Sequence, residues 1–318
     1  MKLRLKGKER KMNSRIFYLG MAVMLVGAMV APTGAVAQKK ILANSMSTVT
    51  HFWFATQRDE VKAVCEKRGV TRWFVDGQNR AEKQVADLED LAIKKPDIVL
   101  INTMFANAIT PGVEALRKAG IPVVVLSSPL GQGVKMDCWV SGDQSAITRQ
   151  QAEVAAKAMN YEGNWIEIDG MPGSLINKER GDAWVEVFNK YPKLKRTGRF
   201  IGNYVRHEAV KIMEDVLQSH KEPIKMVYAH NDEMALGVIQ VLKEAGRLQQ
   251  IMVNGADALM PETKEAIAKG EMFSSSRWPT FGKEAATVAC EYLLDGKPLP
   301  QKSFAPIYVA TKETLKDW

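Results

Sequence analysis

From about residue 40 onward, short runs of apolar and β-branched residues alternate with longer stretches whose apolar residues recur every three or four positions. The short runs predict strands, and the longer stretches predict amphipathic helices. Several strand runs are apolar on both faces, which is typical of a parallel sheet covered by helices on each side. The alternation predicts a doubly wound, parallel-sheet α/β fold. Strands are predicted at Ile41 to Met46, Arg72 to Val75, Asp97 to Asn102, Pro122 to Leu126, Trp139 to Gly142, Trp165 to Ile168, Met226 to Ala229 and Met252 to Gly255.

A different pattern occupies the first 37 residues. A basic stretch precedes an apolar run from Ile16 to Ala31, and the small-residue tripeptide Ala35-Val36-Ala37 follows. This order predicts a secretory signal peptide, cleaved after Ala37, and a periplasmic location. An uncleaved anchor is the alternative, but an apolar run of about 16 residues is short for a span of about 20. Met12 to Ala37 is itself a complete signal peptide, so the start stays open between Met1 and Met12.

Cleavage changes the charge of the chain. The formal charge is +8, and residues 1–37 carry seven Lys and Arg and one Glu, so their removal takes away +6 and leaves +2. The basic character therefore belongs mainly to the targeting segment, and the composition does not favour nucleic acid as a partner.

Motifs for catalysis, cofactors and metals are missing from the sequence. No G-x-G-x-x-G follows a strand, the segment Gly170 to Gly173 lacks the required spacing, and there is no P-loop and no G-x-S-x-G. The four histidines form no metal-spaced cluster. We therefore expect no enzymatic activity, no cofactor and no metal.

Three cysteines, Cys65, Cys138 and Cys290, are far apart and lack metal-ligand spacing. An oxidising compartment permits a disulfide, and at least one thiol must stay unpaired. Because Cys65 and Cys290 lie in helical patterns, we expect buried free thiols, with the disulfide as the open alternative.

Polar and aromatic residues are concentrated in the segments that follow the strand runs. In doubly wound sheets ligands bind at the carboxyl ends of strands, so these segments are the candidate site. Their hydroxyls, amides, carboxylates and rings suit a polyhydroxylated ligand. The segments are 47–54, 76–79, 103–105, 127–128, 170–178, 204–206, 230–233, 256–257 and 276–278.

The run Ala229 to Gly237, which includes the segment 230–233, carries Asn-Asp-Glu-Met-Ala-Leu-Gly. It resembles a strand-to-helix turn of periplasmic sugar-binding proteins of the ribose-binding type. Further matches follow in order along nearly the whole chain beyond the signal peptide. They are Asp76 to Asn79, Ile121 to Val123, Glu179 to Gly181, and Asp257 after Val253 to Gly255.

The resemblance implies two doubly wound parallel-sheet lobes joined by a three-crossing hinge. The N-terminal lobe would comprise 38–142 and 279–305, and the C-terminal lobe 143–278 and 306–318. It also implies a monomeric substrate-binding component of an ABC importer, whose membrane subunits recognise the loaded protein. A chemoreceptor or sensor kinase as the partner is the alternative. A repressor of related fold would need an N-terminal helix-turn-helix where this chain has its export signal.

Ligand contacts also follow from the resemblance. Asn231 and Asp257 match positions that contact sugar hydroxyls, although helix capping is the alternative for each, with Asp232 the better cap. Trp53 and Phe54, with Tyr204 from the other lobe, match rings that sandwich the sugar, and core packing is their alternative. Ser47 is a hydroxyl candidate or a turn residue.

Departures from the ribose pattern bear on the ligand. Ser127-Ser128 stand where proteins of the ribose-binding type have an Asp-Arg pair. Lys178 stands in place of an Arg, Arg277 in place of an amide, and His51 in place of an Asn. Serines cannot make the bidentate contacts of that pair, so we do not expect ribose itself. A neutral sugar or polyol is the main hypothesis. A sugar acid or other small carboxylate, bound by Arg277, Lys178, His51 or Arg206, is the alternative.

Overall fold

The computed structural model describes residues 39–317, which belong to one compact unit, Lys39–Trp318. The predicted signal peptide, residues 1–37, and its cleavage site lie outside the described residues. Within 39–317, no helix has both the length and the apolar character that a membrane span requires.

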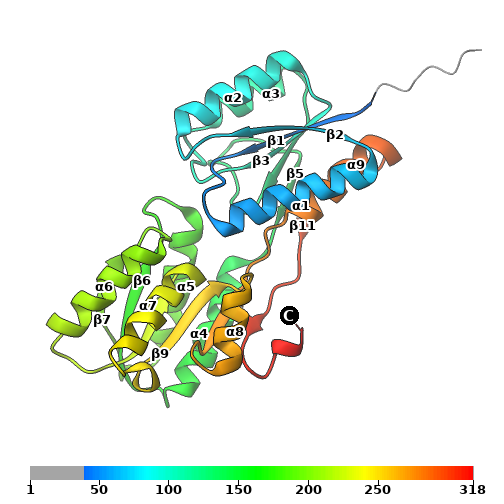
Figure 1. The fold of residues 1–318 in the computed structure, drawn as a ribbon. Helices are drawn as coiled ribbons and strands as arrows, with labels where there is room; N and C mark the ends of the chain where they lie inside the picture. Colours follow the sequence, from blue (N-terminus) through cyan, green and yellow to red (C-terminus); the bar gives the residue numbers. More distant parts are fainter. Residues whose placement is uncertain (1–38, 318) are drawn as a thin grey trace, which may run out of the picture. The chain divides into compact units, whose positions relative to one another are not determined.

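The first sheet is six-stranded, in the order β11-β5-β4-β3-β1-β2, and all its pairs are parallel. Four helices belong with it (Figure 1). Its strands are β1 (Ile41–Met46), β2 (Thr71–Asp76), β3 (Ile98–Asn102), β4 (Val123–Leu126), β5 (Cys138–Ser141) and β11 (Lys302–Phe304). The helices are α1 (Phe52–Arg68), α2 (Ala81–Lys94), α3 (Thr110–Lys118) and α9 (Gly282–Asp295).

The second sheet is also six-stranded, in the order β12-β10-β9-β8-β6-β7, and only the β10–β12 pair is antiparallel. Its strands are β6 (Gly163–Asp169), β7 (Leu194–Ile201), β8 (Ile224–Ala229), β9 (Met252–Asp257), β10 (Ser274–Arg277) and β12 (Val309–Ala310). Its helices are α4 (Gln144–Ala158), α5 (Leu175–Phe188), α6 (Arg206–Ser219), α7 (Asp232–Glu244) and α8 (Pro261–Lys269), and two 3-10 turns lie at Leu248–Gln250 and Leu315–Asp317.

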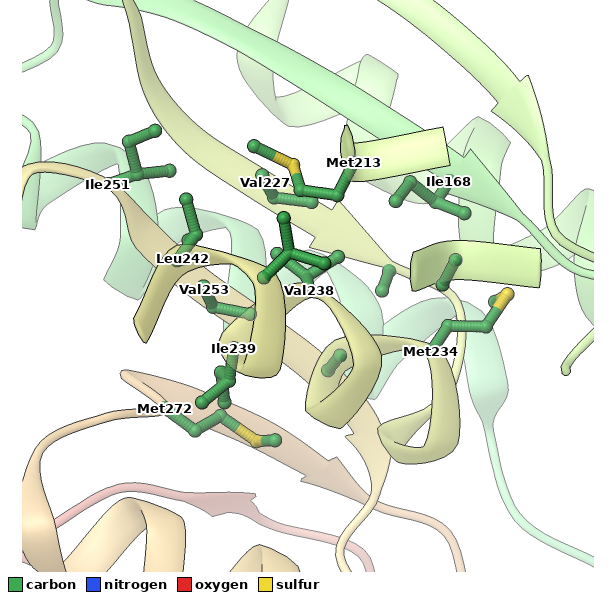
Figure 2. Close-up of a cluster of buried hydrophobic side chains, with 14 of the residues drawn as sticks. Ile168, Met213, Val227, Met234, Val238, Ile239, Leu242, Ile251, Val253 and Met272 are labelled. Carbon is green, nitrogen blue, oxygen red and sulfur yellow. The ribbon is translucent and has the colours of Figure 1, made fainter. Parts of the chain in front are cut away.

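Each sheet is covered on both faces by apolar clusters, as doubly wound sheets require. On the first sheet, one cluster involves α1 and α9 and the other α2 and α3. On the second sheet, α4 and α5 cover one face, where the Trp184 and Tyr228 rings stack 3.8 Å apart. Figure 2 shows the opposite face, where Val238 and Leu242 of α7 pack against Val227 and Val253 of the sheet.

The α/β fold with two parallel-sheet layers confirms the predicted fold class. All eight predicted strands exist, with ends that differ by at most two residues, and the structure adds four more, β7, β10, β11 and β12. β7 is a polar edge strand, and β10 contains three fully buried serines, of which Ser274 and Ser275 are hydrogen-bonded to Asn254 and Asp232. Neither strand has the apolar run on which strand prediction depends.

Two short strands near the C-terminus pair with different sheets. β11 pairs with β5 in the first sheet, and β12 pairs with β10 in the second. The lobe boundaries expected from the resemblance stay a prediction.

The three cysteines are buried and free, as predicted. The Cys65 and Cys290 thiols are hydrogen-bonded to each other between α1 and α9, and that contact together with burial raises the pKa of Cys65.

Replacing Leu242 with Ala should lower the free energy of unfolding by about 2–5 kcal/mol. Leu242 is fully buried in the α7 cluster, so truncation leaves a cavity. Urea unfolding followed by circular dichroism measures the change. Ile93→Ala is the control, because Ile93 is 79% exposed and should change stability by no more than about 0.5 kcal/mol. Equal losses in the two variants would contradict the placement of Leu242 in the core.

Candidate ligand-binding site

A cavity lies at the carboxyl ends of the parallel strands, between loops of the first sheet and loops of the second. This is the position that the strand-end rule predicts for a ligand site. Its lining mixes aromatic rings, thioethers, hydroxyls, amides and one ion pair. The lining residues are His51, Trp53, Phe54, Asn102, Thr103, Met104, Ser127, Ser128, Met171, Ser174, Ile176, Arg180, Tyr204, Asn231, Asp257 and Trp278.

Most of the residues proposed from the sequence lie together around this cavity. The structure gathers His51, Trp53, Phe54, Ser127, Ser128, Tyr204, Asn231 and Asp257. It does not bring Ser47, Lys178 or Arg277 into the lining. Ser47 is fully buried behind the strand end, and the Arg277 guanidinium donates to the Ala258 carbonyl.

Lys178, which the sequence suggested as a contact, and Arg180, which it did not, lie on different faces of α5. The Lys178 side chain is 71% exposed, pairs with Asp182 and lines a neighbouring hollow that shares several residues with the cavity. Two residues along a helix rotate a side chain by about 200°, so Arg180 points the opposite way and is 2% exposed. The segment expected at this strand end stopped at Lys178, and therefore missed the cation that lines the cavity.

Arg180 is bonded on several sides. Its Nε donates to Gln144 Oε1 at 3.2 Å, Nη1 donates to the His230 carbonyl, and Nη2 lies 2.7 Å from Asp257 Oδ1. Burial acts to lower its pKa, but Asp257 outweighs that effect, so the pKa of Arg180 is raised. A buried guanidinium is stable here because its partners replace water.

Asn231 caps a helix and also lies in the lining of the cavity. It is itself the N-cap of α7, because its Oδ1 accepts from the Met234 amide at 3.0 Å, so Asp232 is not the cap. Its Nδ2 donates to the Tyr204 carbonyl at 3.1 Å. One N–H and one lone pair of the amide are left for a ligand at the cavity wall.

Aromatic side chains define the apolar part of the cavity. Trp53 and Phe54 lie edge to face, 5.1 Å apart, and Trp53 Nε1 donates to the Trp278 carbonyl at 3.2 Å. Trp278 in turn donates through Nε1 to Ser127 Oγ at 3.3 Å. Trp278 belongs to the predicted segment 276–278 but was not itself among the predicted ligand contacts.

Tyr204 lies on the other side of the cavity, against Gly170. A Cβ on Gly170 would come within 2.0 Å of the Tyr204 ring, so only glycine permits this contact. Burial raises the pKa of Tyr204 to about 12. The phenol therefore stays neutral and can donate a hydrogen bond.

Three lining residues have left-handed backbone conformations. The φ angles are 63° at Ser127, 65° at Tyr204 and 111° at Asp257. Such conformations are costly for residues other than glycine and are concentrated at functional sites. Ser127 directly follows β4, Tyr204 lies in the turn after β7, Asp257 is the last residue of β9, and all three line the cavity.

One buried group has the composition of a metal site. Glu167, Asp169 and His230 offer ligand atoms within 4.8 Å of one another. The carboxylates, however, already accept from Arg196 at 2.5 Å and Arg199 at 2.7 Å. Ion pairing within the described residues therefore accounts for this cluster.

The fold and the cavity between its two sheets define a substrate-binding protein, and sequence comparison agrees. Residues 42–298 match the family described as periplasmic binding protein domain. The ribose import binding protein of Bacillus subtilis is 30% identical over 273 residues, covering 85% of this chain and 86% of its own length. The galactofuranose-binding protein of Escherichia coli is 27% identical over 271 residues, covering 83% of each.

A solved ABC transporter solute-binding protein from Mycobacterium smegmatis, with bound glycerol, superimposes with a TM-score of 0.80. It is 27% identical, and the match covers 88% of this chain and 96% of that one. The chain belongs to the periplasmic binding protein domain family. Members of this family are substrate-binding proteins of transport systems.

A buried carboxyl beside the cavity predicts a pH effect on stability. Burial, and then the neighbouring Asp257, raise the pKa of Asp232 above its ordinary 3.8, although Ser275 and the Ala258 amide donate to it. The folded state then binds more protons than the unfolded state. The contribution of Asp232 to the free energy of unfolding is therefore complete below about pH 4 and falls as pH rises.

Asp232→Asn should remove this dependence, because the amide can accept from Ala258 and donate to Ser275. Urea unfolding of variant and wild type should give a difference in unfolding free energy that increasingly favours the variant between about pH 5 and pH 8. The control is Asp215→Asn, at an exposed site on α6. A difference independent of pH would contradict the raised pKa.

Proposed function

We propose that this chain is the periplasmic substrate-binding component of an ABC importer and captures a neutral sugar or polyol. The observation that carries the proposal is the cavity, where rings from both sheets surround hydroxyls, amides and one internally paired charge. Relatives that import ribose and bind galactofuranose support a carbohydrate ligand, and so does the M. smegmatis structure with glycerol.

The charges favour a neutral ligand over a sugar acid. The acid hypothesis requires free cations at the cavity, yet Lys178 pairs with Asp182, and Arg206 pairs with Glu233 and Glu262. Neither Arg206 nor Arg277 lines the cavity. Arg180 does, but it is already paired with Asp257.

His51 also lines the cavity without adding charge. Burial lowers its pKa from the ordinary 6.5, and the opposing effect of Glu233 is smaller. The ring is therefore mainly neutral at pH 7 and serves as a hydrogen-bonding or packing group.

The proposed recognition uses the two faces of a polyhydroxylated molecule. The rings of Trp53, Phe54 and Tyr204 would cover its C–H surface, as aromatic rings do with sugars. Asp257 would accept from a ligand hydroxyl while Arg180 and Asn231 donate to its neighbours. Water excluded from such a site no longer competes for these bonds.

Calorimetry with D-ribose, glycerol, neutral hexoses, myo-inositol, and aldonic and uronic acids tests the ligand class. We expect heat of binding from at least one neutral compound and none from the acids. Asp257→Asn leaves the buried Arg180 without its counter-charge, and Asn231→Ala removes an amide from the cavity wall, so each should weaken binding by about tenfold or more. Lys178→Ala is the control and should stay within about twofold. Selective binding of acids would refute the neutral-ligand proposal.

We further propose that the mature chain is monomeric, begins at Gln38 and catalyses no reaction. Its lobes would comprise 38–142 with 279–305, and 143–278 with 306–318, and the pairing of β11 and β12 with different sheets supports this division.

Intact mass spectrometry of protein from a periplasmic fraction should give the mass of residues 38–318. Ala37→Arg should block processing, because signal peptidase requires a small residue there. Thr33→Ser, which retains a small polar residue upstream of the cleavage site, is the control. A full-length mass for the wild type would refute the cleavage site.

A further inference from the structure

A buried histidine next to the cavity is not explained by ligand contact. His230 is fully buried at the end of β8, one residue before Asn231, and does not line the cavity. Its Nδ1 lies 2.7 Å from Asn177 Oδ1, and its Nε2 lies 2.9 Å from Glu167 Oε1. Both ring nitrogens are thus hydrogen-bonded to oxygen atoms.

The partner at Nδ1 is an acceptor. The backbone N–H of Gly170 donates to the same Asn177 oxygen at 2.6 Å, which identifies that atom as the amide carbonyl oxygen. A carbonyl oxygen cannot donate, so the proton of this bond belongs to His230 Nδ1.

The partner at Nε2 is an acceptor as well. Burial by itself would raise the pKa of Glu167, but hydrogen bonds from His230 and Arg196 outweigh it, and the pKa of Glu167 is lowered. Glu167 is therefore an ionised carboxylate that accepts. Both nitrogens of His230 donate, and that is the hydrogen-bonding pattern of the imidazolium cation.

The surrounding charges suit a cation at this position. From β6, Glu167 and Asp169 face the ring, with Asp169 Oδ1 at 3.6 Å from Nε2. From β7, Arg196 and Arg199 pair with the far side of these carboxylates, but their side chains are 34% and 52% exposed. The imidazolium of His230 is therefore the fully buried counter-charge to Glu167 and Asp169.

Two further elements complete its surroundings. Tyr228 on β8 lies with its ring 4.9 Å away, and the pKa of this phenol is raised by burial, so it is neutral. From α5 come Asn177 and the guanidinium of Arg180, whose Nη1 donates to the His230 backbone carbonyl.

His230 is connected to the ligand cavity by two routes, one through its backbone and one through its ring. Through its carbonyl, His230 holds Arg180, which pairs with Asp257 in the lining. Through Asn177, it holds the amide of Gly170, the residue against which the Tyr204 ring packs.

We propose that His230 is a positioning residue that acts as a buried imidazolium and holds Arg180 and the Gly170 turn in the arrangement that binds ligand. Each of these ring bonds requires a proton on its own nitrogen, so loss of one proton breaks the bond to Asn177 or the bond to Glu167. Ligand affinity should therefore be lower when the ring is deprotonated.

Nitrogen NMR of the ligand-free mature chain tests the charge state. With ¹⁵N-labelled histidine, both ring nitrogens of His230 should give protonated signals at neutral pH. The Gly170 amide and the Arg180 Nε–H should shift at the same pH midpoint as the ring. One unprotonated ring nitrogen at neutral pH would overturn the proposal, and so would Gly170 and Arg180 signals that do not follow the ring.

Binding provides the second readout, which rests on the proposed function. D-ribose and glycerol are titrated by calorimetry from about pH 6 to about pH 9, a range that spans histidine titration in proteins. Wild-type affinity should decline at the alkaline end. His230→Gln, which is uncharged at every pH, should bind several-fold more weakly at low pH and show no decline.

His220→Gln serves as the control, because it removes a ring that is bonded to Thr197 on β7 and does not line the cavity. This variant should keep the alkaline decline. The same decline in His230→Gln would refute the role of its proton. If neither compound binds the wild type, the ligand proposal fails for these compounds, while the NMR experiment still decides the charge and position of His230.

Discussion

The burial of the Arg180 guanidinium is the constraint around which the second lobe is arranged. A charge removed from water must recover its solvation from fixed partners. Here these partners come from α4 through Gln144, from the end of β8 through the His230 carbonyl, and from the end of β9 through Asp257. Because the elements meet at one side chain, the strand ends that face the ligand are held in register with one another.

The central strands could be predicted because a strand buried on both faces has a continuous apolar run in its sequence. β3 and β4 are fully buried, and their runs of Val, Ile and Leu are apolar on both faces. β10 could not, because Ser274 and Ser275 are buried through bonds to Asn254 and Asp232, which belong to other elements. A hydroxyl whose partner is distant in sequence looks the same as one in a loop.

The loops that form the candidate site could be predicted from the sequence, but the individual side chains could be predicted less well. Strand ends located the segments, since parallel strands bring their carboxyl ends to one edge. Which residue of a helix faces inward depends on where the helix begins, and α5 begins at Leu175, which places Arg180 inside and Lys178 outside. Packing of the helix against the sheet decides which of its side chains face inward.

The left-handed backbone at Ser127, Tyr204 and Asp257 limits how this protein can acquire a new ligand. Gly, Asn and Asp tolerate a positive φ best, and β-branched residues tolerate it least. A branched apolar residue such as Val or Ile would therefore be strained at any of these three positions. The backbone itself thus limits how apolar this part of the lining can become, whatever residues replace the rest.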